Sequence, residues 1–102
     1  MNAFYFNSRS KPGHKTQERM CYNYAQGRFS DGDIFLKYED GDTEDRPAFN
    51  CLVEHIKNGL ISTIIIYHSD CLGGDLLEKA RFVDMLRKQQ VNFVSVAEHI
   101  YF

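Results

Sequence analysis

The run Ser62–Tyr67, which contains three consecutive isoleucines, constrains the fold more than any other part of this chain. β-Branched residues favour strands, and successive side chains of a strand point to opposite faces of the sheet. A run that is apolar at successive positions therefore has to be covered on both faces. A parallel sheet with helices on both sides provides that cover, so the run predicts an α/β fold.

The rest of the chain alternates between short apolar runs and stretches in which apolar residues recur with the period of a helix. The order of these segments is βαβαβαβ, which predicts a mostly parallel four-stranded sheet with helices on both faces. The expected strands are Ala3–Phe6, Ile34–Tyr38, Ser62–Tyr67 and Val91–Val96, and the expected helices run from Thr16 to about Gln26, from Pro47 to Gly59 and from Asp75 onward.

Residues that favour helix starts lead into each expected helix. We expect Thr16 to cap the first helix, Asp45 to cap the second ahead of Pro47, and Asp75 to cap the third. The residues that we expect the third helix to bury are Leu76, Leu77, Ala80, Val83 and Leu86.

Size and charge narrow the classes of function. The chain has 102 residues, 43% of them hydrophobic, which is enough for one modest core, so we expect a single domain over residues 1–102. Its formal net charge is −2. Proteins that bind nucleic acid by themselves normally carry a basic excess that neutralises phosphates. We therefore expect DNA binding by this chain alone to be weak or absent.

The sequence lacks the patterns that are typical of several classes of protein and binding site. No apolar run reaches membrane-spanning length, and the first residues lack the pattern of a signal peptide. The three cysteines, Cys21, Cys51 and Cys71, are widely spaced, so we expect neither a disulfide framework nor a zinc site, and a cytoplasmic protein. The chain has no Gly-x-Gly-x-x-Gly and no Gly-Lys-Ser/Thr. We expect no cofactor, no metal and no membrane partner.

Chemistry in a parallel sheet gathers at the carboxyl ends of the strands. The expected loops at those ends cover residues 7–11, 39–45 and 68–74. The first loop offers hydroxyls and cations, and the third offers His68, Asp70 and Cys71. One open interpretation is a small α/β enzyme that uses one of these three side chains. Solvated polar loops and a turn-forming aspartate are the alternative.

Three blocks of the sequence give more specific information about the fold and the function. An acidic residue, Asp40, is followed after a glycine-containing loop by Arg-Pro-Ala-Phe at residues 46–49. A helix, a glycine and a strand then lead to Asp-Cys-Leu-Gly-Gly at residues 70–74, and residues 90–98 read Gln-Val-Asn-Phe-Val-Ser-Val-Ala-Glu. In these blocks the chain resembles the catalytic domain of the serine recombinases, the resolvase/invertase family. The resemblance covers nearly all of the chain and implies the resolvase-like fold.

The resemblance also implies a chemistry. Members of this family attack a DNA phosphate with a serine in a Tyr-x-Arg-x-Ser pattern, and arginines offset the charge that develops on the phosphoryl oxygens. In this chain the tyrosine is present, an asparagine replaces the arginine and an arginine replaces the serine. A cysteine and a glycine stand at both arginine positions after the third strand. The family-like residues are Tyr5, Gln17, Asp40, Arg46 and Asp70, and the substituted positions are Asn7, Arg9, Cys71 and Gly74.

Two functions follow from the resemblance. In the first, which the loss of nucleophile and cations favours, the domain is catalytically degenerate and acts as a binding or regulatory module in a mobile-element or prophage setting. Its partner would be a recombinase or another protein. In the alternative, the chain is part of an active site-specific recombinase that cleaves and rejoins DNA through Ser10 or Ser8. Arg9, Arg46 and Asp70 would then complete the catalytic set.

In the family, this domain continues into a long dimerisation helix and a separate DNA-binding segment. We expect the present chain to correspond to the catalytic module without those two parts. A homodimer stays open.

Overall fold

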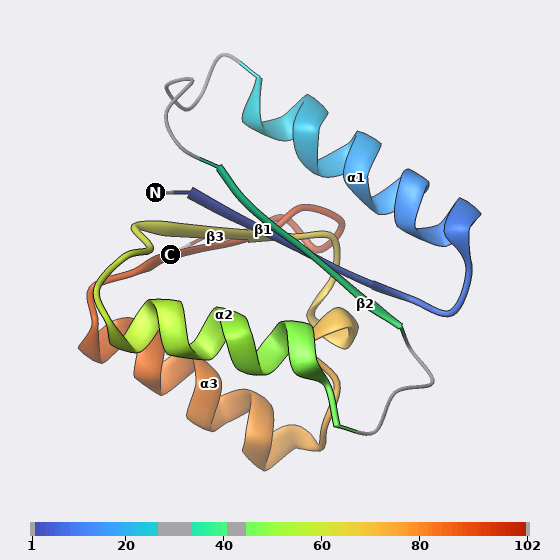
Figure 1. Cartoon of the computed structure of the whole chain (residues 1–102). Helices are drawn as coiled ribbons and strands as arrows, with labels where there is room; N and C mark the ends of the chain where they lie inside the picture. The colour runs from blue at the N-terminus through green and yellow to red at the C-terminus, as the bar shows by residue number, and fades with distance from the viewer. Residues whose placement is uncertain (1, 27–33, 41–44, 102) are drawn as a thin grey trace.

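A computed structural model describes residues 2–26 and 45–101 and, for residues 34–40, the backbone (Figure 1). The elements are β1 (Asn2–Ser8), α1 (Lys11–Ala25), β2 (Ile34–Asp40), α2 (Pro47–Lys57), β3 (Thr63–Ile66), the 3-10 helix η1 (Ser69–Leu72), α3 (Leu76–Lys88), β4 (Asn92–Ser95) and β5 (Ile100–Tyr101). The strands lie in the order β2-β1-β3-β4-β5. The first four pair in parallel, and β5 pairs antiparallel to β4. The predicted fold class is confirmed, with one short edge strand that the sequence pattern did not predict.

Helices cover both faces of the sheet, as the isoleucine run predicts. Figure 1 shows α1 on one side and α2 and α3 on the other. Ile64 and Ile66 belong to the core that includes side chains of α2 and α3, whereas Ile65 belongs to the core that includes Cys21 of α1. All three isoleucines are at most 1% exposed. The alternation of the strand thus divides one apolar run between two cores.

The first loop is shorter than predicted, because the helix does not start at Thr16. Ser10 caps α1: its Oγ accepts a hydrogen bond from the Gly13 N–H at 3.1 Å. Pro12 lies in the first turn, where its missing N–H costs no helical hydrogen bond. Thr16 lies inside the helix and donates its hydroxyl to the Pro12 carbonyl at 3.0 Å. β1 extends to Ser8, so Arg9 and Ser10 alone connect the two elements.

The second helix also starts differently. Its cap is Arg46, in the left-handed conformation (φ 48°, ψ 58°) and without a side-chain capping hydrogen bond, so the expectation that Asp45 caps α2 is wrong. The Asp45 carbonyl instead accepts a hydrogen bond from Asn50 Nδ2 at 2.8 Å. Pro47 occupies the first turn, as predicted. A left-handed arginine costs about 1–2 kcal/mol, so surrounding contacts have to hold it in place.

In the third helix the cap is confirmed and the buried face is corrected. Asp75 accepts a hydrogen bond from the Glu78 N–H at 2.8 Å. Leu86 is fully buried, as predicted, but the other side chain that α3 buries is Phe82, whereas Leu76 is 85% and Leu77 58% exposed. Both sets of positions have helical spacing, so contact with α2 and β4 decides between them. No helix in the described ranges is both long enough and apolar enough to span a bilayer.

Candidate functional site

The carboxyl ends of β1 and β3, the start of α1 and η1 enclose a shallow hollow of about 520 Å³. Parallel pairing places these ends side by side, since Tyr5 of β1 is in register with Ile66 of β3. The hollow is therefore at the edge where the sequence predicts chemistry. Its lining residues are Asn7, Ser8, Arg9, Gln17, Tyr67, His68, Asp70, Cys71 and Gly73.

Asn7, at the first substituted position, is part of a hydrogen-bonded bracket across this hollow. Gln17 Oε1 accepts from the Asn7 N–H at 3.0 Å, and Gln17 Nε2 donates to the Asn7 carbonyl at 2.7 Å. The Asn7 side chain donates through Nδ2 to the Cys71 carbonyl at 3.0 Å. Cys71 Sγ lies 3.6 Å from Gln17 Oε1 as a weak donor. These contacts join β1, α1 and η1 through neutral groups alone.

Both candidate serines make hydrogen bonds near the start of α1. Ser10 Oγ caps the helix through Gly13. Ser8 Oγ accepts from the Ser10 N–H at 3.3 Å, and the Ser8 N–H donates to His14 Nε2 at 3.2 Å. A Cβ added at Gly13 would overlap the Ser8 hydroxyl, so the helix start packs closely on this strand end. Arg9 and Ser8 line the same hollow.

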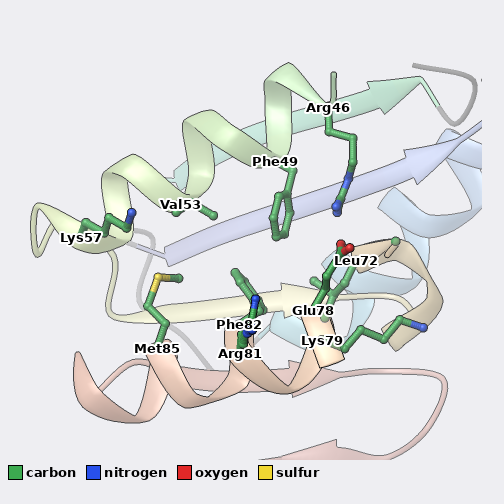
Figure 2. A pocket seen from close by; sticks show the side chains of 11 residues that line it. Arg46, Phe49, Val53, Lys57, Leu72, Glu78, Lys79, Arg81, Phe82 and Met85 are labelled. Carbon is green, nitrogen blue, oxygen red and sulfur yellow. The ribbon is translucent and has the colours of Figure 1, made fainter. Parts of the chain in front are cut away.

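Arg46, the retained arginine of the second block, does not line this hollow. It lines a different cavity, between α2 and α3, where its guanidinium carbon lies 4.0 Å from the centroid of the Phe49 ring (Figure 2). A Cβ added at Gly73 would come within 3.1 Å of that carbon. Within the described ranges, Arg46 Nε and Nη2 are buried and have no hydrogen-bond partner.

Two further family-like residues have different surroundings. Tyr5 is fully buried, and its ring packs edge-on against Phe49 with centroids 5.8 Å apart, so it belongs to the core beneath α2. Asp40 ends β2, in register with Ser8 of β1, which puts its backbone at the predicted edge. The side chain of Asp40 and the acidic segment 41–44 lie outside the residues described in full.

Asp70 is at the rim of the hollow. Its side chain is 81% exposed, and its Oδ1 lies 3.5 Å from Lys79 Nζ of α3. Its backbone N–H donates to His68 Nδ1 at 3.0 Å, which fixes the turn at the start of η1. Lys79 therefore pairs with Asp70, whereas Asp75, four residues before Lys79, serves as the helix cap.

Glu98 is a site residue that we did not single out from the sequence, although it closes the third family-like block. Its carboxylate accepts three hydrogen bonds: from the Ser95 hydroxyl at 2.6 Å, from the Ser69 N–H at 2.6 Å and from the Ser69 hydroxyl at 3.0 Å. Partial burial alone would raise the pKa of Glu98, but these hydrogen bonds and the His68 ring outweigh it and lower the pKa. The result is a fixed carboxylate that ties β4 to η1.

The buried thiols are poorly suited to nucleophilic chemistry. Burial raises the pKa of Cys71, and its hydrogen bonds with the backbone at His68 and Asn7 oppose only part of that effect. Burial, with a smaller contribution from Cys71, raises the pKa of Cys21 to about 12. Because the thiolate is the reactive form, both groups stay in their unreactive form at neutral pH. Within the described ranges, no three His, Cys, Asp or Glu residues lie close enough to hold a metal ion.

Known proteins share this architecture. The family model "Resolvase, N terminal domain" matches residues 7–102. The N-terminal catalytic domain of TP901-1 integrase is 21% identical, with a TM-score of 0.81 over 97% of this chain and 79% of that one. A resolvase family site-specific recombinase from Streptococcus pneumoniae is 16% identical, with a TM-score of 0.77 over 99% of this chain and 76% of that one. The C-terminal catalytic domain of ISC1926 TnpA, an IS607-like serine recombinase, is 14% identical, with a TM-score of 0.77 over 94% and 70%. No curated protein matches the sequence.

Proposed function

The chain belongs to the resolvase family of serine recombinases, whose N-terminal domain it matches over residues 7–102, and from that premise we propose that it acts as a binding or regulatory module of a recombination system. In this proposal the domain keeps the family scaffold and contacts a recombinase in a mobile-element or prophage setting. It does not form a phosphoserine itself. The observation that carries the proposal is that the retained Arg46 and the candidate Ser8 line different cavities, while the candidate Ser10 caps α1.

The serines support this proposal through the hydrogen bonds they make. A nucleophilic hydroxyl needs a base that accepts its proton, or a cation that lowers its pKa. Ser10 Oγ accepts the capping hydrogen bond from Gly13, and Ser8 Oγ accepts from the Ser10 N–H. His14 Nε2, the ring nitrogen beside Ser8, accepts from the Ser8 backbone N–H, so that nitrogen is engaged by the backbone.

The cations support it as well. Removing one group that stabilises developing charge typically costs about 10²–10³ in rate. Asn7, Cys71 and Gly74 are uncharged at three positions where the family pattern has arginine. Arg46 contacts Phe49 and Gly73 in the cavity between α2 and α3. Among the described residues, Arg9 is the arginine that lines the same hollow as Ser8, so it would be the arginine nearest to a phosphate held there.

Serine recombinase domains act as oligomers together with DNA and partner proteins. For the present chain we place the protein partner first, because a net charge of −2 gives little general attraction for phosphates. A second copy of the chain is the other protein partner that this family relationship suggests. The described cysteines are free thiols, which suits the cytoplasm where such a complex would form.

The test combines a binding assay with an adduct assay. The protein is incubated at micromolar concentration with a resolvase-family recombinase and a supercoiled plasmid that carries the recombinase's site. We expect a complex between the two proteins in gel filtration and a changed yield of recombinant plasmid. Absence of both effects would overturn the binding proposal, whatever the adduct assay shows.

A second candidate function, strand cleavage by this domain, has two observations in its favour. Arg9 and Ser8 line one hollow, and Ser8 is in register with Asp40 of β2. An active domain would give a denaturant-stable protein–DNA adduct on the same plasmid. That adduct would disappear in Ser10→Ala or in Ser8→Ala but persist in Thr16→Ala, a matched hydroxyl loss on α1. If the parent protein forms no adduct, this candidate is excluded.

A further inference from the structure

The cavity between α2 and α3 has a volume of about 290 Å³ (Figure 2). Apart from Gly73, its lining residues differ from those of the hollow at the strand ends. Ligand pockets typically hold about 300–1,000 Å³, so this one suits a small molecule. Gly73, in the turn after η1, lines both cavities. No step of the proposed function uses the space between the two helices.

One wall of the cavity is apolar. Phe49 and Val53 come from α2, and Phe82 and Met85 come from α3. The two phenylalanine rings are tilted against each other with centroids 5.1 Å apart. A wall of two aromatic rings, a branched side chain and a thioether favours an apolar ligand body, especially an aromatic one.

Arg46 supplies the polar end of the same cavity. Figure 2 shows its side chain beside Phe49, extending from the start of α2 toward Leu72 and Glu78. In the described part of the chain, its buried Nε and Nη2 atoms have no hydrogen-bond partner. These two nitrogens form one edge of the guanidinium, the edge that binds both oxygens of a carboxylate side-on. A buried donor without a partner is costly, so a ligand that supplies acceptors there gains the full benefit.

The charges around the cavity favour an anion. Arg46, Lys57, Lys79 and Arg81 line it, against one carboxylate, Glu78. Lys79 is also paired with Asp70 outside the cavity. The four cationic side chains therefore outnumber the two carboxylates, Glu78 and Asp70. The excess suits one negative charge on the ligand, and the apolar wall disfavours a small, fully hydrated ion such as phosphate.

We propose that this cavity binds a small carboxylate with an aromatic body, held by the Nε/Nη2 edge of Arg46, with the ring against Phe49 and Phe82. Recognition needs both parts of the ligand: the carboxylate satisfies the buried donors of Arg46, and the ring covers the apolar wall. The ligand would contact α2, α3 and the turn at Gly73 together, so its binding stabilises their mutual arrangement.

The test is a titration of the ¹⁵N-labelled protein followed by two-dimensional NMR, with phenylacetate as the probe. We expect amide shifts at Val53, Phe82 and Met85, and binding roughly tenfold or more tighter than that of phenylacetamide, the uncharged isostere. Inorganic phosphate should bind more weakly than phenylacetate. Equal binding of phenylacetamide or of phosphate, or shifts confined to residues 7–9, would overturn the proposal.

Variants separate the cavity from the general charge of the protein. Arg46→Gln should weaken phenylacetate binding by roughly tenfold or more. Arg87→Gln, which removes the same charge from α3 outside this cavity, should leave binding unchanged. Glu78→Gln should tighten it, because a like charge is removed. If Arg46→Gln does not fold, Val53→Glu places a carboxylate at the apolar wall and should abolish binding. Unchanged binding in either cavity variant would overturn the proposal.

Discussion

Gln17 satisfies both backbone polar groups of Asn7: its side-chain oxygen accepts from the Asn7 N–H at 3.0 Å, and its nitrogen donates to the Asn7 carbonyl at 2.7 Å. The Gln17 side chain thus makes, near the end of β1, the pair of backbone hydrogen bonds that a neighbouring strand would otherwise make. The Asn7 side chain also donates a hydrogen bond to the Cys71 carbonyl of η1. Asn7 and Gln17 together therefore hold the end of β1, the helix α1 and the helix η1 in place around the hollow.

Gln17→Leu should therefore destabilise the fold. The substitution leaves a partly buried N–H and carbonyl without partners, at a cost of about 1–3 kcal/mol in the free energy of unfolding. Urea denaturation measures this loss. Lys15→Leu, an exposed substitution two residues earlier on α1, should change the free energy by less than about 0.5 kcal/mol. Equal stability of the two variants would contradict the bracket.

Ser10→Ala should cost about 1 kcal/mol of stability, because the first turn of α1 loses its cap. Ser10→Asp should recover most of that loss, since a carboxylate accepts the same hydrogen bond and suits the positive end of the helix. Thermal unfolding followed by circular dichroism compares the three proteins. An aspartate variant no more stable than the alanine variant would show that capping is not the role of this hydroxyl.

Gly73→Ala should destabilise the turn after η1. Gly73 has φ 67° and ψ −171°, a conformation that is essentially restricted to glycine and costs other residues about 1–3 kcal/mol. Its new Cβ would also press on the Arg46 guanidinium. Gly59→Asn is the matched control, because φ there is +73° but a Cβ meets nothing within 4 Å, and asparagine tolerates positive φ. A smaller loss at Gly73 than at Gly59, in urea denaturation, would contradict this account.

Glu98 should make stability depend on pH in the acid range. Its pKa is lowered in the folded protein, so its contribution is fully present above the unfolded value of about 4.3 and is lost as pH falls through the folded pKa. Glu98→Gln should flatten the decline of the unfolding free energy below about pH 4.5. Asp84→Asn, at the exposed pair with Lys88, is the control and should leave the decline nearly unchanged. If the unfolding free energies of the parent protein and Glu98→Gln fall equally as the pH is lowered, the Glu98 carboxylate does not contribute to the acid dependence of stability.

Cys71 should react slowly with alkylating reagents, because burial raises the pKa of its thiol. In the native protein at pH 7.5 we expect iodoacetamide to modify Cys71 more slowly than a free cysteine, with mass spectrometry locating the label. The same peptide in urea should react at the ordinary rate. Faster modification in the native protein would favour the enzyme interpretation that uses this loop.

The layer arrangement was predictable because it depends on patterns that hold along the chain. Three adjacent isoleucines leave no polar face, so Ile64 and Ile66 had to enter one core and Ile65 the other. The order of apolar runs and helical stretches then implied parallel strands, and Asp75 marked a helix start by its chemistry alone.

Some local choices were not predictable, because two candidates satisfied the same rule. We expected Thr16 to cap the first helix, but Ser10, which also carries a hydroxyl, accepts the capping hydrogen bond from Gly13. On α3, Leu76 and Leu77 matched the helical period as well as Phe82 does. Only the positions of α2 and β4 determine which face is covered.

The sequence by itself determined the fold class, the edge of the sheet that collects polar residues, and the family-like positions, since these depend on periodicity and on residue type. The tertiary structure alone decided where those residues act. Arg46 occupies a motif position, but its left-handed backbone and its contacts with Phe49 and Gly73 direct its guanidinium into the cavity between α2 and α3. The direction in which such a side chain points depends on packing between segments that are distant in the chain, and no local pattern of residues encodes that packing.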